Sequence, residues 1–473
     1  MQQQGFSPFL PHYEYIPDGE PHVFGNRLYL YGSHDRFGSG KFCLNDYVAY
    51  SAPLEDLTDW RFEGVIYKKE QDPQNPQGKI SLYAPDVAQG LDGKYYLYYC
   101  LAEIRRVGVA VSDTPVGKFE FLGHVSYKEG IVLGERQGDN FPFDPSIFVD
   151  DGKIWLYVGN GPLKPHHDKK KEKACTVMEL ETDMLTIKQE PVSIIPTLHN
   201  VQGTGFEGHA FFEASSMRKF GDNYYLIYSS TQTHELCYAI SKKPNADFQY
   251  GGVLISNGDI FPGEVDQVDF NMKPHPKIKN YIGNNHGSIV ELNGKYYIFY
   301  HRHTNRAMYS RQACVAEIKM QADGSFEQAL MTSSGLNGKP LKDKGRYEAR
   351  IACQLYASKG ALFSVHPFVQ NKAHPYFTQT DCQYIANLKN GATVGFKSFL
   401  FETANAITIT VRGKGRGEII VKNEEKIIST ISLQPSTHWE CYKGVLETVR
   451  GEQNLYFSYN GKGAVDFLEF ELS

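Results

Sequence analysis

A segment that recurs five times in the first two thirds of the chain constrains its fold most strongly. Each copy joins a turn to an apolar run rich in tyrosine, and Asp-Gly or Asn-Gly pairs supply the positive φ that two-residue hairpin turns need. Successive copies lie 59 to 72 residues apart, which is room for a four-stranded sheet with long loops. The copies are GNRLYLYGS (25–33), DGKYYLYYC (92–100), DGKIWLYVG (151–159), GDNYYLIYS (221–229) and NGKYYIFYH (293–301), with Leu30, Leu97, Leu156, Leu226 and Ile298 as equivalent anchors.

Five such antiparallel units cannot each bury both faces alone, so they are predicted to close around an axis. The predicted fold is all-β, with a five-bladed β-propeller over residues 1–330 and a Gly/Lys-rich linker over 331–345. A jelly-roll-like β-sandwich is predicted over 346–473, where shorter alternating runs such as AITITVRG (406–413) occur. An array of β-sandwiches is the alternative for the first part.

Composition narrows the function classes. The 31 Tyr and 29 Phe favour strands, and a net charge of −5 offers no basic field for a phosphate backbone, so nucleic acid is not an expected partner. No apolar run approaches the roughly 20 residues of a membrane span, and the N-terminus does not resemble a signal peptide. We therefore expect no membrane association and a cytoplasmic location, or a secreted or periplasmic one if a signal was removed. Eight cysteines without a CxxC pair favour reduced thiols.

Titratable residues recur at one position of the repeat. They lie 11 to 13 residues before the anchors, at the mouth of the strand that precedes each hairpin. In a propeller the first strand of each blade lines the central channel, so these side chains are predicted to converge on the axis. The five residues are Asp18, Asp86, Asp144, Glu213 and His286.

Converging carboxylates favour acid/base chemistry. Like charges held close together cannot all ionise, so one carboxyl keeps its proton near neutral pH while another remains a base. Inverting glycoside hydrolases use such a pair at roughly 6.5–9.5 Å, a separation that opposite walls of a channel suit. We expect Glu213 to be the general acid, Asp18 the general base that activates water, and Asp144 the residue that tunes Glu213.

At these residues the sequence resembles glycoside hydrolase family 43, over roughly residues 8–330. The resemblance implies a five-bladed propeller with an N-terminal Asp as base, an Asp of a DPS-like motif as modulator and a Glu as acid, which match Asp18, Asp144 in FDPS and Glu213. Glu213 is followed by Ala-Ser where the family commonly has Gly-Pro. Glu207, six residues upstream, is therefore a second candidate for the acid, although the repeat favours Glu213.

Further roles follow from the same resemblance. It implies that His286 lies near the channel axis, contacts substrate and helps to hold a hydrated calcium ion. Arg311 resembles an arginine of the substrate pocket, and Asp86 matches a position that is structural or lines the pocket. The C-terminal region resembles a family 6 carbohydrate-binding module, in which calcium and a sugar chain can bind. No organic cofactor is implied.

The predicted activity is inverting removal of terminal α-L-arabinofuranosyl or β-D-xylosyl residues from hemicellulose, with plant cell-wall oligo- or polysaccharides as binding partners. A non-catalytic polysaccharide-binding propeller or lectin is one alternative. A five-bladed fructan hydrolase is another, although the WMNDPNG-like signature expected there is missing around Asp18. The choice between arabinose and xylose, exo or endo action and the oligomeric state stay open.

Overall fold

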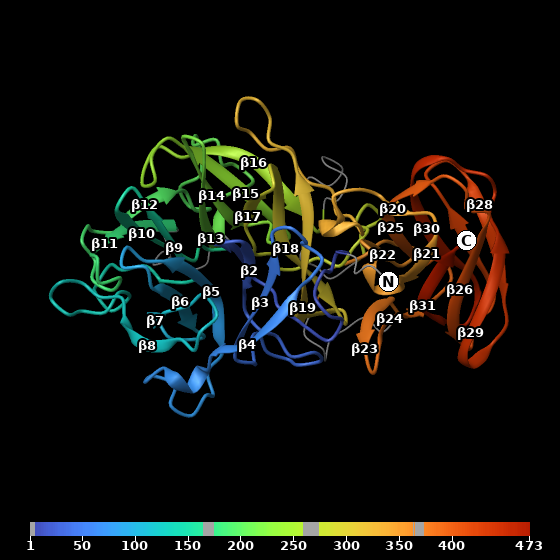
Figure 1. Ribbon diagram of the computed structural model, residues 1–473, viewed down its shortest axis with the longest axis horizontal. Helices are drawn as coiled ribbons and strands as arrows, with labels where there is room; N and C mark the ends of the chain where they lie inside the picture. The colour runs from blue at the N-terminus through green and yellow to red at the C-terminus, as the bar shows by residue number, and fades with distance from the viewer. Residues whose placement is uncertain (1–4, 164–174, 259–273, 363, 365–372) are drawn as a thin grey trace.

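The computed structural model describes residues 5–163, 175–258, 274–362, 364 and 373–473 (Figure 1). Strands dominate throughout, and the helical segments of the described residues are short 3-10 turns, η1 (Lys69–Gln71), η3 (Gly335–Asn337) and η4 (Ala349–Ile351). The all-β prediction is confirmed. Within these ranges, no helix has the length and apolar character needed to cross a membrane.

Five antiparallel sheets follow one another up to residue 318. Each is a meander in chain order, and each repeat segment forms its second strand. The sheets are β1 (Glu20–Phe24), β2 (Arg27–Tyr31), β3 (Tyr47–Pro53) and β4 (Arg61–Tyr67); β5 (Leu82–Gln89), β6 (Tyr95–Leu101), β7 (Val107–Ser112) and β8 (Glu120–His124); β9 (Ser146–Asp150), β10 (Lys153–Val158), β11 (Cys175–Leu180) and β12 (Val192–Ile195); β13 (Phe211–Phe220), β14 (Asn223–Ser230), β15 (Glu235–Ser241) and β16 (Gln249–Ser256); β17 (Ile289–Leu292), β18 (Lys295–Thr304) and β19 (Ala307–Ile318).

The turns before the repeat segments explain the hairpins. Phe24 pairs with Arg27 and Asp150 with Lys153, so two residues close each of these turns. Gly25 and Gly152 have φ of 60° and 70°, a conformation that glycine adopts without steric cost. The second hairpin differs from the prediction, because Gln89 pairs with Tyr95 across a longer loop.

Hydrophobic clusters join the five sheets in a closed order. Each cluster lies between two successive sheets, and one of them joins the first sheet to the fifth through residues such as Leu30 and Phe299. Every sheet is therefore buried on both faces by its neighbours, which is what an isolated blade-like sheet lacks. The first strands of neighbouring sheets also contact each other, β17 with β1, β1 with β5, β5 with β9 and β9 with β13, so the inner strands of the sheets surround a common centre.

The C-terminal region, orange to red in Figure 1, forms two further sheets that share one hydrophobic core. Strand pairing of this region begins at Leu341, inside the stretch predicted as linker. One sheet contains β20 (Leu341–Lys342), β22 (Gln354–Tyr356), β25 (Thr393–Phe401), β27 (Arg416–Lys422), β28 (Ile427–Leu433) and β30 (Gly451–Lys462), and the other β21 (Gly345–Glu348), β23 (Tyr376–Gln379), β24 (Gln383–Leu388), β26 (Ala406–Gly413), β29 (Ser436–Val445) and β31 (Val465–Leu472).

Candidate active site

One cavity of about 390 Å³ collects most of the predicted site residues. Its polar lining includes the three predicted catalytic carboxylates together with His286 and Arg311. Aromatic side chains form much of the remaining wall, which suits a pocket that holds a sugar ring on its apolar face. The aromatic residues are Phe42, Tyr83, Phe143 and Phe212.

Strained backbone at the mouths of the inner strands aims these side chains. Asp18 and Asp144 have φ of 58° and 45°, and Ala214, which follows Glu213, has φ of 67°. The left-handed conformation costs a residue with a Cβ about 1–2 kcal/mol, so the surrounding fold must hold it in place. A left-handed residue thus lies just before β9 and near the start of β13, and the carboxylates of Asp144 and Glu213 reach the cavity at these two places.

Asp18 is held as a charged group. Arg311 Nη1 donates to Asp18 Oδ1 at 2.9 Å, and the Arg311 Nε donates to Asp35 Oδ2 at 2.9 Å. Burial alone would raise the pKa of Asp18, but the positive charge of Arg311, with smaller contributions from His301 and His286, lowers it below its ordinary value. An ionised carboxylate at the cavity wall is suited to accept a proton.

Arg311 is largely committed to protein partners. Besides Asp18, it makes a two-pronged contact with Asp35, through Nε–Oδ2 at 2.9 Å and Nη2–Oδ1 at 3.0 Å. Its guanidinium also lies over the ring of Phe42, 4.8 Å from the centroid. Arg311 therefore lines the cavity as predicted, and its contacts fix the position of Asp18 as well.

Glu213 is held in the opposite state. Burial raises the pKa of Glu213 well above its ordinary value, and the charges of Asp144 and Asp18 raise it further. Burial also raises the pKa of Asp144, to about 7, although His286 opposes this. Asn160 Nδ2 donates to Glu213 Oε2 at 3.2 Å, and the backbone N–H of Ala214 donates to Asp144 Oδ2 at 3.1 Å. Glu213 is thus poised to carry a proton at neutral pH.

His286 lies between two carboxylates. Its Nδ1 is 3.7 Å from Asp144 Oδ2, and its Nε2 is 3.7 Å from Glu20 Oε1. Burial lowers the pKa of His286, but Glu20, Asp144 and Asp18 together raise it to about 9. The imidazole can therefore carry the positive charge that these carboxylates require.

A calcium ion, as the resemblance implies, is compatible with this place. Glu20 Oε1 is buried and, apart from its ion pair with His286, has no hydrogen-bond partner among the described residues, so it could serve as an oxygen ligand beside the imidazole. Calcium takes six to eight oxygen ligands, so water would fill most of its shell here. A ligating imidazole must be neutral, so bound calcium and a protonated His286 are alternative sources of the same positive charge.

Asp86 requires a correction, because it does not line the cavity. It is fully buried, its Oδ1 lies 2.6 Å from His22 Nε2, and its Oδ2 accepts from Ser146 Oγ at 3.0 Å and from the Ile147 N–H at 2.9 Å. A register shift between Tyr83 and Asp86 displaces it along the strand. These protein contacts fit the structural alternative for Asp86, and only its predicted place in the pocket wall is wrong.

Strand pairing defines the level to which Asp86 belongs. Asp86 pairs with Tyr98, one residue after the anchor Leu97, and the same offset holds for Glu20, Ser146 and Ser216. We call these four residues the buried level, and we call Asp18, Asp144, Glu213 and His286 the cavity level. The titratable residues of the repeat lie 11, 12 or 13 residues before the anchors because the strands begin irregularly. The number of residues alone therefore does not show which level a side chain belongs to.

Glu207, the second candidate for the acid, lies elsewhere. It is exposed, and its Oε1 accepts from the backbone N–H groups of Gly203 and Thr204. It therefore stabilises a turn and is not among the residues that line the cavity.

Sequence reasoning missed three polar residues of the site. Asp35 orients Arg311, and Thr233 and Asn284 line the cavity with side-chain oxygens that have no hydrogen-bond partner among the described residues. Asp35 follows the first repeat segment in SHDRFG, where a charged residue next to a buried strand was the available signal. Thr233 and Asn284 lie outside the repeat register, so no pattern marked them.

Comparisons with known proteins agree with this geometry. The model of glycosyl hydrolases family 43 matches residues 17–326. A protein of Thermoclostridium stercorarium named "Xylosidase/arabinosidase" is 47% identical over 481 residues, covering 100% of this chain and 99% of its own length.

Solved structures give the same result. A family 43 arabinoxylan arabinofuranohydrolase from Bacillus subtilis, solved with cellotetraose, has a TM-score of 0.52 at 19% identity and covers 98% of this chain and 96% of its own, which shows a shared fold. CoXyl43, a β-xylosidase/α-arabinofuranosidase from a compost metagenome solved with xylotriose in a calcium-free form, has a TM-score of 0.52 at 27% identity over 69% of this chain and 98% of its own. These matches favour neither the lectin nor the fructan hydrolase alternative. The chain belongs to glycosyl hydrolases family 43 and is a glycoside hydrolase.

Proposed function

We propose that this chain removes terminal β-D-xylosyl or α-L-arabinofuranosyl residues from xylan- or arabinan-type chains with inversion of configuration. One observation carries the proposal: a single cavity contains a carboxylate with a lowered pKa, Asp18, and a carboxyl with a raised pKa, Glu213. Acid and base are thus present in the correct states at one pH. The xylosidase/arabinosidase that is 47% identical along the full chain supports the pentose.

In the proposed reaction Glu213 donates its proton to the glycosidic oxygen as the bond to the anomeric carbon breaks. Asp18 removes a proton from a water molecule, whose oxygen forms the new bond at that carbon. Asp144 acts through Glu213, because its charge helps to raise the pKa of the acid. Asp18 then releases its proton to solvent and Glu213 takes one up from solvent, so each carboxyl regains its starting state.

The cavity also offers contacts for sugar hydroxyls. Thr233 Oγ1 and Asn284 Oδ1 have no protein partner among the described residues, and buried polar atoms of this kind require one. We propose that hydroxyls of the terminal sugar supply it. Calcium, if bound by His286 and Glu20, would add positive charge close to the carboxylate of Asp144.

For the architecture, we propose that the five sheets are the blades of a propeller formed by residues 1–330, and that the two C-terminal sheets form a family 6-type carbohydrate-binding sandwich over 341–473. The closed order of the clusters between sheets supports the first part. In the second part, Trp439 is half-buried, with Arg412 4.3 Å from its ring centroid. Loss of retention on an arabinoxylan affinity gel in Trp439→Ala would support sugar binding there.

Hydrolysis of aryl xylosides and arabinofuranosides tests the reaction. We expect Glu213→Gln to lower kcat by about 10²–10⁴-fold on xylobiose, and by less on nitrophenyl glycosides, whose leaving group needs little protonation. Glu207→Gln is the matched control and should keep wild-type activity. An equal loss on both substrate types would exclude Glu213 as the acid, and retention of anomeric configuration by NMR would exclude inversion.

A further inference from the structure

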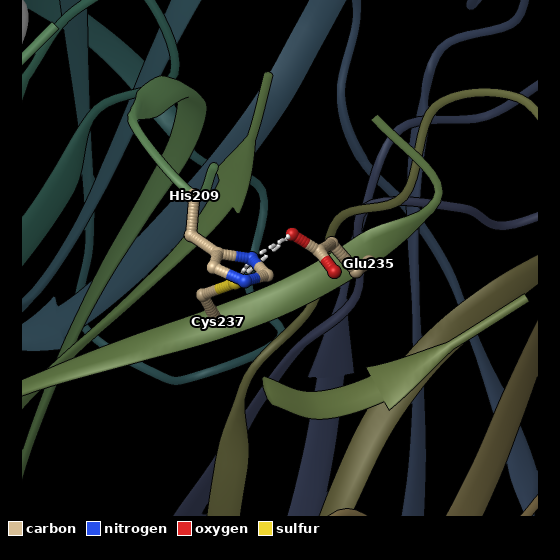
Figure 2. A group of neighbouring side chains, drawn as sticks. All are labelled: His209, Glu235 and Cys237. Atoms are coloured by element: carbon tan, nitrogen blue, oxygen red, sulfur yellow. Dashed lines mark hydrogen bonds and ion pairs between the residues drawn. The ribbon is translucent and has the colours of Figure 1, made fainter. Parts of the chain in front are cut away.

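Three side chains with metal-binding atoms meet in the fourth sheet, apart from the residues that line the catalytic cavity. His209 precedes β13, while Glu235 and Cys237 lie two residues apart on β15 and therefore on the same face of that strand (Figure 2). His209 Nδ1 lies 2.7 Å from Glu235 Oε1 and 3.9 Å from Cys237 Sγ, and the Sγ–Oε1 distance is 3.4 Å.

These distances are close to those of a tetrahedral zinc site. Zinc binds nitrogen and oxygen at about 2.0–2.1 Å and sulfur at about 2.3 Å, which places neighbouring ligand atoms roughly 3.3–3.6 Å apart. The two distances to sulfur already lie within about 0.4 Å of that range. The nitrogen–oxygen distance would widen by about 0.6 Å as a metal replaces the hydrogen bond.

Neighbouring side chains hold the three ligands in place. Ser230 Oγ donates to Glu235 Oε1, and Tyr228 OH donates to the carbonyl of His209 at 2.8 Å. The ring of Tyr250 stacks on the imidazole of His209 with centroids 5.0 Å apart and planes 13° apart. Partners of this kind fix ligand orientation in known metal sites.

Burial and chemistry define the ion. The side chain of His209 is 32% exposed, while Glu235 and Cys237 are buried, so an ion would enter from the histidine side and keep water in its fourth position. A thiolate, an imidazole and one carboxylate are a ligand set that favours zinc over calcium or magnesium, which prefer oxygen alone.

We propose that His209, Glu235 and Cys237 form a binding site for a thiophilic divalent cation of the zinc type. Binding releases the thiol proton of Cys237 to solvent, and Nδ1 of His209 gives up its proton so that the neutral ring carries its single proton on Nε2. The metal links β15 to the segment that leads into Glu213, and the loop before β15 carries Thr233 of the cavity. A bound metal would thus join two segments that each carry a residue of the cavity, Glu213 and Thr233.

Titration of the full-length protein with Co²⁺ tests the thiolate ligand directly, because sulfur-to-cobalt charge transfer absorbs in the near ultraviolet. We expect one equivalent to bind with this band in the wild type and in Cys175→Ser, and the band to vanish in Cys237→Ser. Cys175 is a matched control, since it is a buried strand cysteine of the neighbouring sheet, packed in the same hydrophobic cluster. A missing band in the wild type, or an equal band in Cys237→Ser, overturns the proposal.

Two further variants guard against misfolding of Cys237→Ser. His209→Ala removes a partly exposed ligand, and Ser230→Ala removes only the hydroxyl that orients Glu235. We expect zinc affinity, measured by competition with a chromophoric chelator, to fall at least about tenfold in each, as for orienting partners elsewhere. Wild-type affinity in His209→Ala overturns the proposed site.

Discussion

Asp18 and Glu20 are carboxylates two residues apart at the start of the same inner strand, yet their surroundings differ completely. Asp18 lines the cavity and depends on Arg311 for its charge, whereas Glu20 Oε2 accepts from Arg218 Nη2 at 2.6 Å and from Ser216 Oγ at 2.9 Å. The same contrast separates the cavity level from the buried level at Asp144 and Asp86. Residue type therefore does not decide which carboxylates reach the cavity here; their position along the inner strands does.

The largest expected effect separates these two residues by activity. Asp18→Asn should lower kcat by about 10²–10⁴-fold with the fold intact, because Arg311 keeps Asp35 as its partner. Glu20→Gln should instead lower the free energy of unfolding by about 3–5 kcal/mol, because it leaves the Arg218 guanidinium without its charge partner. Steady-state kinetics and urea denaturation of both variants measure this. A folded Glu20→Gln enzyme that is as inactive as Asp18→Asn would remove the distinction between the levels.

The second expected effect is on the stability of the buried level. Asp86→Asn should lower the free energy of unfolding by about 3–5 kcal/mol, because it breaks a buried pair with His22 and places an amide against N–H donors. Asp150→Asn is the control, since Asp150 pairs with Lys219 near the surface, where such a pair contributes about 0–1 kcal/mol. Similar values for the two variants in denaturant titrations would contradict the assignment.

Much of the fold and of the cavity could be predicted from the sequence. The residues that could not be predicted were missed for a physical reason. Turn dipeptides and the tyrosine-rich runs located the second strands, since both act locally. Asp18, Asp144 and Glu213 reached the cavity as expected. Asp86 did not, because an irregular strand start moves a side chain by a level without leaving a trace in residue types. Asp35 and Thr233 reach the site through loops whose paths depend on tertiary packing.

The two levels should also respond oppositely to pH. Burial would raise the pKa of Asp86, but His22 and hydrogen bonds lower it, so its stabilisation is present above the ordinary value of about 3.9 and is lost in acid. The pKa of Glu213 is raised, so the folded state holds a proton that the unfolded chain releases above about 4.3, and stability falls as pH rises from there.

Melting temperatures between pH 4 and 8 measure this difference. Glu213→Gln should melt above the wild type at neutral pH, because a neutral amide removes the cost of protonating the carboxyl on folding. Asp86→Asn should melt below it by a nearly constant gap over this range, and melts continued below about pH 4 should show the gap narrowing. A Glu213→Gln variant that is less stable than wild type at pH 7 would show that Glu213 is ionised in the folded enzyme.

The smallest expected effect comes from comparing a hydroxyl of the buried level with one that lines the cavity. Ser216 Oγ already bonds to Glu20 and Ser288, whereas Thr233 Oγ1 faces the cavity without a partner among the described residues. Thr233→Val keeps the shape and removes the hydroxyl, so kcat/KM should fall about 2–10-fold, the value of one neutral hydrogen bond to the sugar. Thr233→Ser restores the hydroxyl and should restore most of the activity. Stability should hardly change in Thr233→Val, because the free enzyme loses no hydrogen bond. Ser216→Ala removes one of the two donors to Glu20 Oε2, with Arg218 as the other, and should lower the free energy of unfolding. If Thr233→Val raised kcat/KM instead, binding of the substrate would remove water from the hydroxyl without giving it a hydrogen bond. The terminal ring would then have to bind elsewhere in the cavity.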